Sequence, residues 1–193
     1  MDAERSTTIT DVGVMRALAH PARLALLDHL LHAGPATATE CAGVVNLTPS
    51  ATSYHLRALA KVGIVEEAPG RGDGRERLWR TTSGDYRFDS RVDPDPATGQ
   101  AKRELLDTFF VWEDAQIRQY LARADDEPKE WRDAAIFGGW TLMMTAEELA
   151  EVGEAIKRLL RPYWMRTRKD PPDAARRVFA VVRACPTDPP LRP

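Results

Sequence analysis

The sequence predicts an α+β protein that is mostly α-helical with a small β component. One observation is a run over 48–62 in which apolar residues recur at helical spacing between a clear start signal and a glycine. A second is a pair of short strand-like segments, 64–68 and 75–80, on either side of a glycine-rich loop. The third is the composition, because 43% hydrophobic and 29% charged residues allow a chain of 193 residues to bury a core.

The composition also narrows the class of protein. The net charge is −2, so a nucleic-acid-binding surface would require a local gathering of basic residues. Cys41 and Cys185 are too few for a disulfide scaffold and have no Cys-x-x-Cys spacing. The chain has no apolar run of about 18 residues, and residues 1–8 lack the basic and apolar regions of a signal peptide. We therefore expect a cytoplasmic protein with no membrane partner.

Short helices are predicted before the run over 48–62. Residues 1–10 are polar and are expected to form a loose arm, and a short helix follows over 12–19. His20 stands at a break before a proline and is interpreted as a turn or cap residue at the start of a leucine-bearing helix. Thr37 and Glu40 have the spacing of a capping box, in which each side chain satisfies a free backbone N–H. A further helix is therefore predicted to begin there.

The run over 48–62 predicts one helix with two different faces. Thr48 is a suitable N-cap, Pro49 suits the first helical position, and Gly63 is expected to end the helix in a left-handed conformation. The inward face consists of Thr52, Leu56, Leu59 and Val62. The outward face carries the hydrogen-bonding residues Ser50, Ser53, Tyr54 and Arg57. Such side chains can bind base edges and phosphates in a DNA major groove, and the alternative is a plain solvent-exposed helix.

The segment after this helix predicts a β-hairpin. Residues 64–68 and 75–80 have the character of two short strands, and the loop between them is too rich in glycine to be helical. Three arginines surround the tip: Arg71, Arg75 and Arg77. Residues 1–47 have a net charge of −2, whereas residues 48–80 have a net charge of +2. The basic charge thus lies where DNA would be contacted; the alternative is a solvent-exposed turn. A capped helix, a turn, a hydrogen-bonding helix and a hairpin together predict a winged helix-turn-helix.

Four segments in a fixed order carry a family resemblance. They are Ala-Leu-Ala-His-Pro-Ala-Arg-Leu-Ala-Leu-Leu at 17–27, Thr-Glu-Cys-Ala at 39–42, Ser-Tyr-His-Leu-Arg-Ala-Leu-Ala-Lys-Val-Gly-Ile-Val at 53–65 and Gly-Arg-Glu-Arg-Leu-Trp-Arg-Thr at 74–81. Together they resemble the winged-helix regulators of the ArsR/SmtB type, over about residues 11–82. The resemblance implies a homodimeric transcription factor that binds a near-palindromic operator in double-stranded DNA and whose affinity is changed by an effector.

The resemblance also places the DNA contacts. It makes the segment from Ser53 to Arg57 part of the reading helix, with His55 at the helix edge near the preceding helix. The predicted DNA-binding residues are Thr37, Thr39, Ser50, Ser53, Tyr54, Arg57, Arg71, Arg75 and Arg77.

One departure from the family concerns metal. Metal-sensing members carry a Cys-x-Cys segment in the helix before the reading helix, or an Asp/His set on a terminal helix, whereas here that helix has Cys41 alone. A thiolate sensor usually needs two or three sulfurs, and a lone buried cysteine is most often a core residue. We therefore predict no metal site and no cofactor, with a metal-responsive sensor as the alternative.

The sequence after the wing predicts a separate second unit. The winged helix-turn-helix is assigned to 1–84, a polar linker with a short strand at 86–88 to 85–97, the second unit to 98–185, and a proline-rich disordered tail to 186–193. The second unit begins with a long helix that bears a broad aromatic face.

The rest of the second unit predicts one more helix and two strands. A capping box at Thr145 and Glu148 opens the helix. The two strands, 137–144 and 178–182, are expected to pair with each other.

Two roles compete for this second unit, namely dimerisation and binding of a small apolar effector. The candidate effector-binding residues are Phe110, Trp112, Trp140, Met143 and Trp164. Ligand pockets are mostly apolar, but aromatic residues at these spacings also form ordinary cores, so the sequence leaves both roles open.

The sequence contains none of the GxSxG, HExxH, GxGxxG or Walker motifs, so we predict that the protein is not an enzyme. The predicted function is a homodimeric, DNA-binding transcriptional repressor of the ArsR-like type. The helix 48–62 would read the operator beside the arginine wing 70–77, with a non-metal effector or none. Besides a metal sensor, the alternative is a winged-helix protein-interaction module that does not bind DNA.

Overall fold

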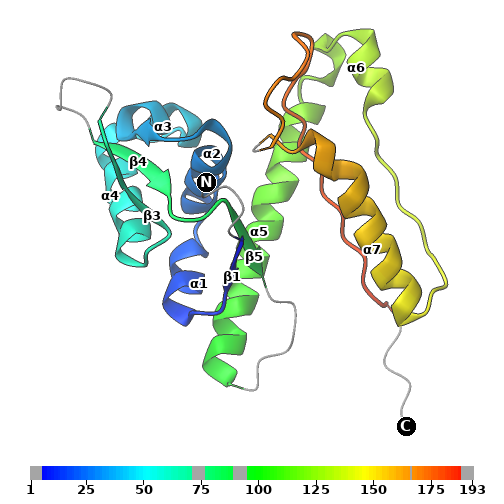
Figure 1. Ribbon diagram of the computed structural model, residues 1–193, viewed down its shortest axis with the longest axis horizontal. Coiled ribbons are helices and arrows are strands. Elements are labelled where there is room, and N and C mark those ends of the chain that lie inside the picture. The colour runs from blue at the N-terminus through cyan, green and yellow to red at the C-terminus, as the bar shows by residue number, and fades with distance from the viewer. Residues whose placement is uncertain (1–5, 71–76, 89–94, 166, 188–193) are drawn as a thin grey trace. The chain divides into compact units, whose positions relative to one another are not determined.

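The computed structural model describes residues 6–70, 77–88, 95–165 and 167–187, which belong to two compact units (Figure 1). The first unit is Met1–Ala115 and the second is Gln116–Pro193. The long helix α5 (Pro96–Leu121) contributes residues to both units. The division between these compact units falls inside this helix. The domain bounds that the sequence predicts, with a linker over 85–97, stay a prediction.

Four short helices of the first unit lie close to where the sequence predicts them. They are α1 (Val12–Leu18), α2 (Pro21–Ala33), α3 (Ala38–Val45) and α4 (Pro49–Lys61). The predicted caps are present. The Thr48 hydroxyl accepts a hydrogen bond from the Ala51 N–H at 3.2 Å, and Pro49 occupies the first turn of α4. His20 caps α2, because its Nδ1 accepts a hydrogen bond from the Ala22 N–H at 3.2 Å.

The wing is an antiparallel hairpin within a three-stranded sheet of order β2-β4-β3. β3 (Val65–Ala68) pairs with β4 (Leu78–Thr81), which confirms the predicted hairpin. β2 (Ala36–Thr37) pairs with the other edge of β4 and is not predicted from the sequence. A strand of two residues is too short to show the alternation by which strands are recognised.

A second, two-stranded sheet joins two polar segments of the first unit. β1 (Ser6–Ile9) pairs in parallel with β5 (Asp85–Phe88). The loose arm predicted over 1–10 is thus corrected to a strand over part of its length, and β5 places the short strand predicted at 86–88 in the first unit. Ile9 is the buried anchor of β1, and a single apolar residue carries no periodic signal in the sequence.

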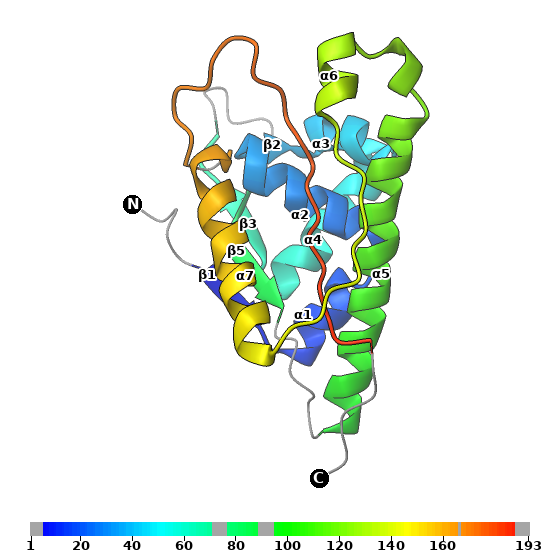
Figure 2. The ribbon, with the colours of Figure 1, turned by 90° about the vertical axis from the view of Figure 1, so that its right-hand side faces the viewer.

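The core of the first unit lies between α1, α2, α4 and the N-terminal part of α5 (Figures 1 and 2). The leucines with no exposed surface are Leu18, Leu26, Leu56 and Leu59. α5 adds Leu105 and Trp112, both buried. Burial of a leucine side chain stabilises a fold by about 1.5–3 kcal/mol, so this packing holds α4 firmly against the rest of the unit.

The second unit contains short helical elements joined by extended segments. They are the end of α5, η1 (Ala124–Asp126), α6 (Lys129–Ala134), α7 (Ala146–Leu160) and η2 (Arg161–Tyr163). The capping box predicted at Thr145 and Glu148 is present. None of the unit's described residues is buried. Within the described parts of the chain, no helix is both long and apolar enough to span a membrane.

The two strands predicted in this unit, 137–144 and 178–182, are not formed. Both segments are coil, and their large apolar side chains are exposed, Met143 to 96%. Strand preference largely reflects packing on a half-buried sheet surface, which neither segment has. Instead, the chain before the second segment is held by Arg176, whose guanidinium donates to both carboxylate oxygens of Glu127 at 2.6 and 3.0 Å. Residues 188–193 of the predicted tail lie outside the described residues.

Candidate nucleic-acid interface

α3, the turn after it and α4 form the helix-turn-helix. α3 begins with the predicted capping box, in which the Thr37 N–H donates to the Glu40 carboxylate at 2.7 Å and the Glu40 N–H donates to the Thr37 hydroxyl at 3.1 Å. The helix ends at Asn46, whose φ of +51° is left-handed. Asparagine enters this conformation more readily than most residues. The chain can therefore turn within Asn46 and Leu47 before Thr48 caps α4.

α4 has the two faces that the sequence predicts. Its buried face consists of Thr52, Leu56 and Leu59, each with no exposed surface. Its exposed face carries Ser50, Tyr54 and Arg57, with Ser53 half-buried beside them. Because residues three or four apart are neighbours on a helix, these side chains form one polar stripe. No ion pair joins Arg57 to another described residue, so its guanidinium is available to a ligand.

The end of α4 fixes where the wing begins. Gly63 has a φ of +74°, as predicted, and glycine adopts this conformation without a Cβ penalty. The Ile64 N–H then donates back to the Leu59 carbonyl at 3.1 Å. From the far end of the wing, the Thr82 hydroxyl donates to the Gly63 carbonyl at 2.7 Å, and the Tyr86 hydroxyl donates to the Ile64 carbonyl at 2.8 Å. The wing is thus hydrogen-bonded to the end of α4.

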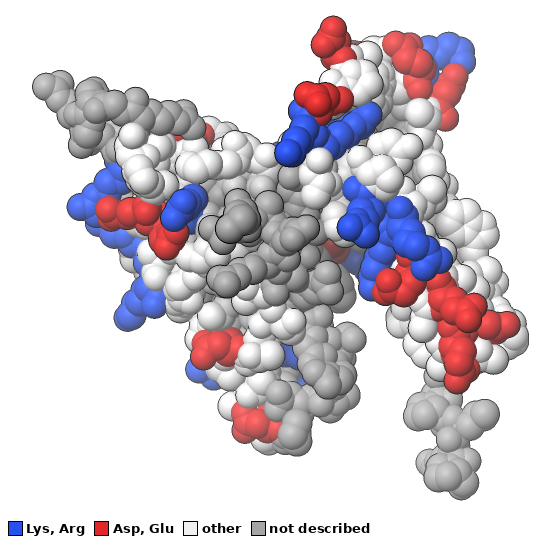
Figure 3. Space-filling model, viewed as in Figure 1, with Lys and Arg blue, Asp and Glu red and all other residues white. Residues whose placement is uncertain are grey.

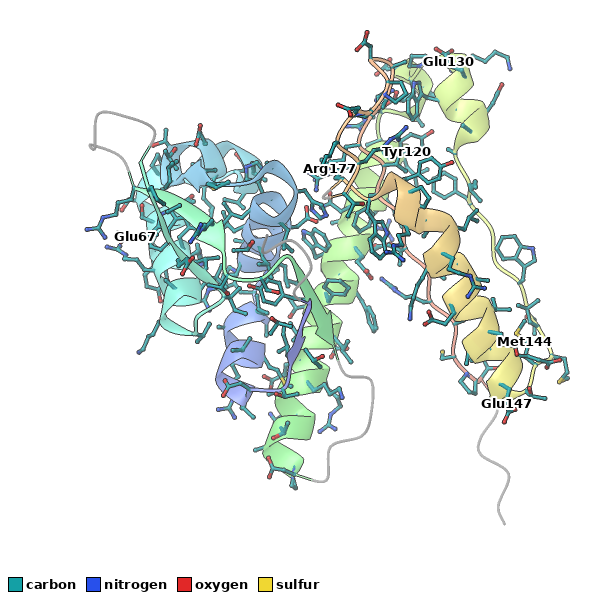
Figure 4. The ribbon with its side chains drawn as sticks, viewed as in Figure 1. Glu67, Tyr120, Glu130, Met144, Glu147 and Arg177 are labelled. Carbon is teal, nitrogen blue, oxygen red and sulfur yellow. The ribbon has the colours of Figure 1, made fainter. Side chains whose placement is uncertain are left out.

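Two cross-strand ion pairs oppose the basic charge of the wing. The Arg77 guanidinium lies 2.7 Å from the Glu67 carboxylate, and the Arg80 guanidinium lies 2.7 Å from the Glu66 carboxylate. Acidic and basic side chains consequently lie together on this hairpin (Figures 3 and 4, where Glu67 is labelled). A phosphate that binds Arg77 would have to share or displace an existing carboxylate partner.

The other predicted contacts differ in their placement. Thr39 is exposed on α3. Thr37 is only 8% exposed, and its hydroxyl is engaged in the capping box, so its clearest role is to begin α3. Arg71 and Arg75 lie in the segment 71–76, outside the described residues.

Three side chains, His20, Arg23 and His55, form a cluster that joins α4 to the start of α2. The sequence does not predict that these residues lie together. The Arg23 Nε donates to the His55 Nδ1 at 3.4 Å, and its Nη1 donates to the Ala17 carbonyl at 2.9 Å. The His20 ring centroid lies 4.6 Å from that of His55. The family resemblance places His55 near the preceding helix, α3, whereas these contacts are with α2 and its cap. Arg23 and His55 are 32 positions apart, so local spacing gives no signal of their contact.

Both imidazoles of this cluster use Nδ1 as an acceptor, which requires the neutral ring. Burial lowers the pKa of His55, and the nearby charges of His20 and Arg23 lower it further. Burial and then the charge of Arg23 lower the pKa of His20.

Cys41 is part of the hydrophobic core and has no exposed surface. Burial, reinforced by the charge of Glu40, raises the pKa of its thiol to about 11. The thiolate is the form that binds metals and attacks electrophiles, so this cysteine is held in its unreactive form near neutral pH. In the described ranges, no group of three or more His, Cys, Asp or Glu side chains could hold a metal ion.

The five candidate effector-binding residues are divided between the two units. Phe110 and Trp112 belong to the first unit, where Trp112 is buried in the core. Trp140, Met143 and Trp164 belong to the second unit, where Trp140 is 76% and Met143 is 96% exposed. Neither unit by itself brings the five residues together.

Comparison with known families adds to this geometry. Residues 18–68 match a family model described as a helix-turn-helix domain. This segment is similar to helix-turn-helix domains, in agreement with the helix-turn-helix that α3 and α4 form. It extends from the end of α1 to the end of β3 and includes all of α4, which confirms the predicted resemblance and the fold class of the first unit. The match indicates a DNA-binding transcriptional regulator, a class that is generally not enzymatic. None of the curated proteins compared with the chain matches it.

Three solved structures are similar at low identity. A mutant of ZitR from Lactococcus lactis in its apo form has 16% identity and a TM-score of 0.32, and the alignment covers 76% of this chain and 83% of that one. A mutant of MarR from E. coli complexed with operator DNA has 18% identity and a TM-score of 0.33, with 76% and 83% covered. RV1404 from Mycobacterium tuberculosis has 15% identity and a TM-score of 0.31, with 84% and 86% covered. Because these TM-scores are low, the functional argument rests on this chain's own residues.

Proposed function

We propose that the chain is a homodimeric transcriptional repressor that binds a near-palindromic operator through α4 and the wing. The observation that carries this proposal is the exposed stripe of Ser50, Tyr54 and Arg57 on a helix whose opposite face is fully buried. Short hydroxyl groups and a guanidinium can bond to base edges and phosphates in a major groove. The buried face, in turn, fixes the orientation in which the stripe is presented.

The proposal requires two copies because each copy offers little binding energy. Residues 48–80 carry a net charge of only +2, so a single chain would bind DNA weakly and with strong dependence on salt. A two-fold symmetric dimer would place two α4 helices in successive major grooves, about 34 Å apart, and would bind a near-palindromic site.

The buried thiol of Cys41 argues against a thiolate-based metal effector. We therefore propose that the protein responds to a non-metal effector or to none. A tight metal complex that is lost in Cys41→Ser would contradict this part of the proposal.

Arg57→Ala tests the reading helix directly. The binding of purified protein to a duplex from the promoter beside its own gene would be measured by fluorescence anisotropy over a salt series. We expect Arg57→Ala to weaken specific binding by about 1–3 kcal/mol and binding to a scrambled duplex by much less. Arg103→Ala is the matched control, because Arg103 is also exposed but lies on α5.

Two outcomes would contradict the proposal. One is the absence of binding to any such duplex at low salt, and the other is equal loss in the Arg57 and Arg103 variants. A protein-interaction module would instead retain its partner in Arg57→Ala, and that binding would depend little on salt.

A further inference from the structure

α7 presents an apolar stripe that the second unit does not cover. Val152, Leu159 and Tyr163, in α7 and the η2 turn after it, are 37%, 71% and 62% exposed. Residues four or seven positions apart lie on one side of a helix, so the three side chains form a continuous line. A helix of 15 residues with a side-chain cap at its start is a regular element, but none of its residues is buried. Its apolar side therefore needs a partner.

The charges of α7 are segregated along its length. All four glutamates lie in its first nine residues, Glu147, Glu148, Glu151 and Glu154, and the basic residues Lys157, Arg158 and the C-cap Arg161 follow them. Figure 3 shows acidic side chains gathered where α7 begins and basic ones toward its other end, and Figure 4 labels Glu147 at the beginning. Opposite charges at the two ends make a helix complementary to an antiparallel copy of itself.

Two of these charges border the apolar stripe. Glu151 precedes Val152 by one position, and Arg158 precedes Leu159 by one position, so both charges flank the stripe along the same edge. In an antiparallel pair of identical helices centred between them, Glu151 of each copy meets Arg158 of the other. Glu154 and Lys157 are different, since they already pair with each other within the helix at 2.7 Å.

We propose that α7 packs antiparallel against α7 of a second copy of this chain, with the stripe of Val152, Leu159 and Tyr163 at the centre and two Glu151–Arg158 pairs along one edge. The inference deepens the proposed function, because it names a contact of the homodimer on which operator binding rests. A two-fold interface must be complementary to itself, and the charge order along α7 meets this condition. Parallel packing about a two-fold axis would instead set the edge that carries Glu151 and Arg158 against the other edge of the partner helix, so these opposite charges would not meet.

Charge reversal in the full-length chain tests this arrangement. Glu151→Arg would place two like-charged pairs in the interface, and so would Arg158→Glu. By sedimentation equilibrium, we expect each variant to weaken dimerisation by about tenfold. An equimolar mixture of the two variants should form a heterodimer with near wild-type affinity, because opposite charges again meet in both pairs. Glu154→Arg is the matched control: it makes the same charge change on the side of α7 opposite Val152.

Three outcomes would overturn the inference. They are a wild-type chain that is monomeric at all concentrations, a dimer that neither reversal weakens, and a mixture that fails to restore dimerisation. Circular dichroism of each variant would establish that α7 is still helical. The anisotropy assay with a single half-site duplex tests DNA binding independently of dimerisation, because a monomer with an intact α4 should still bind this duplex weakly at low salt. Loss of dimerisation with half-site binding retained would thus separate the two proposals.

Discussion

Thr52, on the buried face of α4, gives a sharp test of how the reading helix is held. Its side chain has no exposed surface, and its hydroxyl finds no hydrogen-bond partner among the described residues. A buried hydroxyl without a partner costs about 1–3 kcal/mol. Valine has nearly the same shape and a similar helix propensity. We therefore expect Thr52→Val to raise the free energy of unfolding by about 1 kcal/mol.

The control for this prediction is Thr52→Ser, which keeps the hydroxyl and removes the methyl group. Loss of one buried methyl costs about 0.8 kcal/mol in transfer free energy, and the small cavity adds to it, so this variant should be less stable than the wild type. The two substitutions should thus change the free energy of unfolding in opposite directions.

Thermal unfolding followed by circular dichroism would measure both variants, at about 2–4 °C per kcal/mol for a chain of this size. Operator affinity of the folded protein should not change, because Thr52 lies opposite the polar stripe of α4. If Thr52→Val lowered the unfolding temperature as Thr52→Ser does, the hydroxyl would have a bonding role, and the described packing of α4 would be wrong.

Two further predictions concern titratable groups of the first unit. The free energy of unfolding should fall as the pH drops below about 6.5, because the pKa values of His20 and His55 are lowered in the folded chain. The unfolded chain therefore takes up protons first. Above this pH both rings are neutral in the folded and in the unfolded chain, so the free energy of unfolding no longer depends on these two groups. Urea unfolding between pH 7.5 and 5.5 would measure the slope, and an unchanged slope in His20→Gln/His55→Gln would contradict the assignment. Iodoacetamide at pH 8 should alkylate the exposed Cys185 of the native chain and spare the buried Cys41, whose pKa is about 11, whereas both should react in urea. Rapid native labelling of Cys41 would show that the core around it opens.

The parts of the fold that the sequence predicts correctly are those set by local chemistry. Thr48 and Pro49 start α4, the Thr37–Glu40 box starts α3, and Gly63 ends the reading helix, all through groups within a few residues of one another. The alternation of buried and polar positions along α4 is equally local. For this reason the helix-turn-helix and its exposed stripe follow from the sequence.

The parts that the sequence misses depend on distant partners. β1 forms because residues 6–9 pair with residues 85–88, and nothing in the sequence of either segment predicts that the two segments pair. The contact of Arg23 with His55 is of the same kind. In the second unit the sequence predicts a strand that the structure does not contain, because residues 178–182 have strand-forming side chains but no paired strand. Local preference indicates a strand only where a neighbour supplies hydrogen bonds and a surface to pack on.

The distribution of charge suggests how binding is divided between α4 and the wing. Arg77 and Arg80 are paired with carboxylates on β3, but exposed ion pairs of this kind contribute only about 0–1 kcal/mol, so a phosphate can displace them at little cost. Their net gain on binding DNA is then small, because each released carboxylate is left near the phosphate backbone. Arg57 on α4 has no such partner among the described residues and gains its full interaction. Under the proposed function, most of the favourable contact energy should therefore come from the helix whose position is fixed by the core, and a weakly charged protein would discriminate between DNA sequences through that helix.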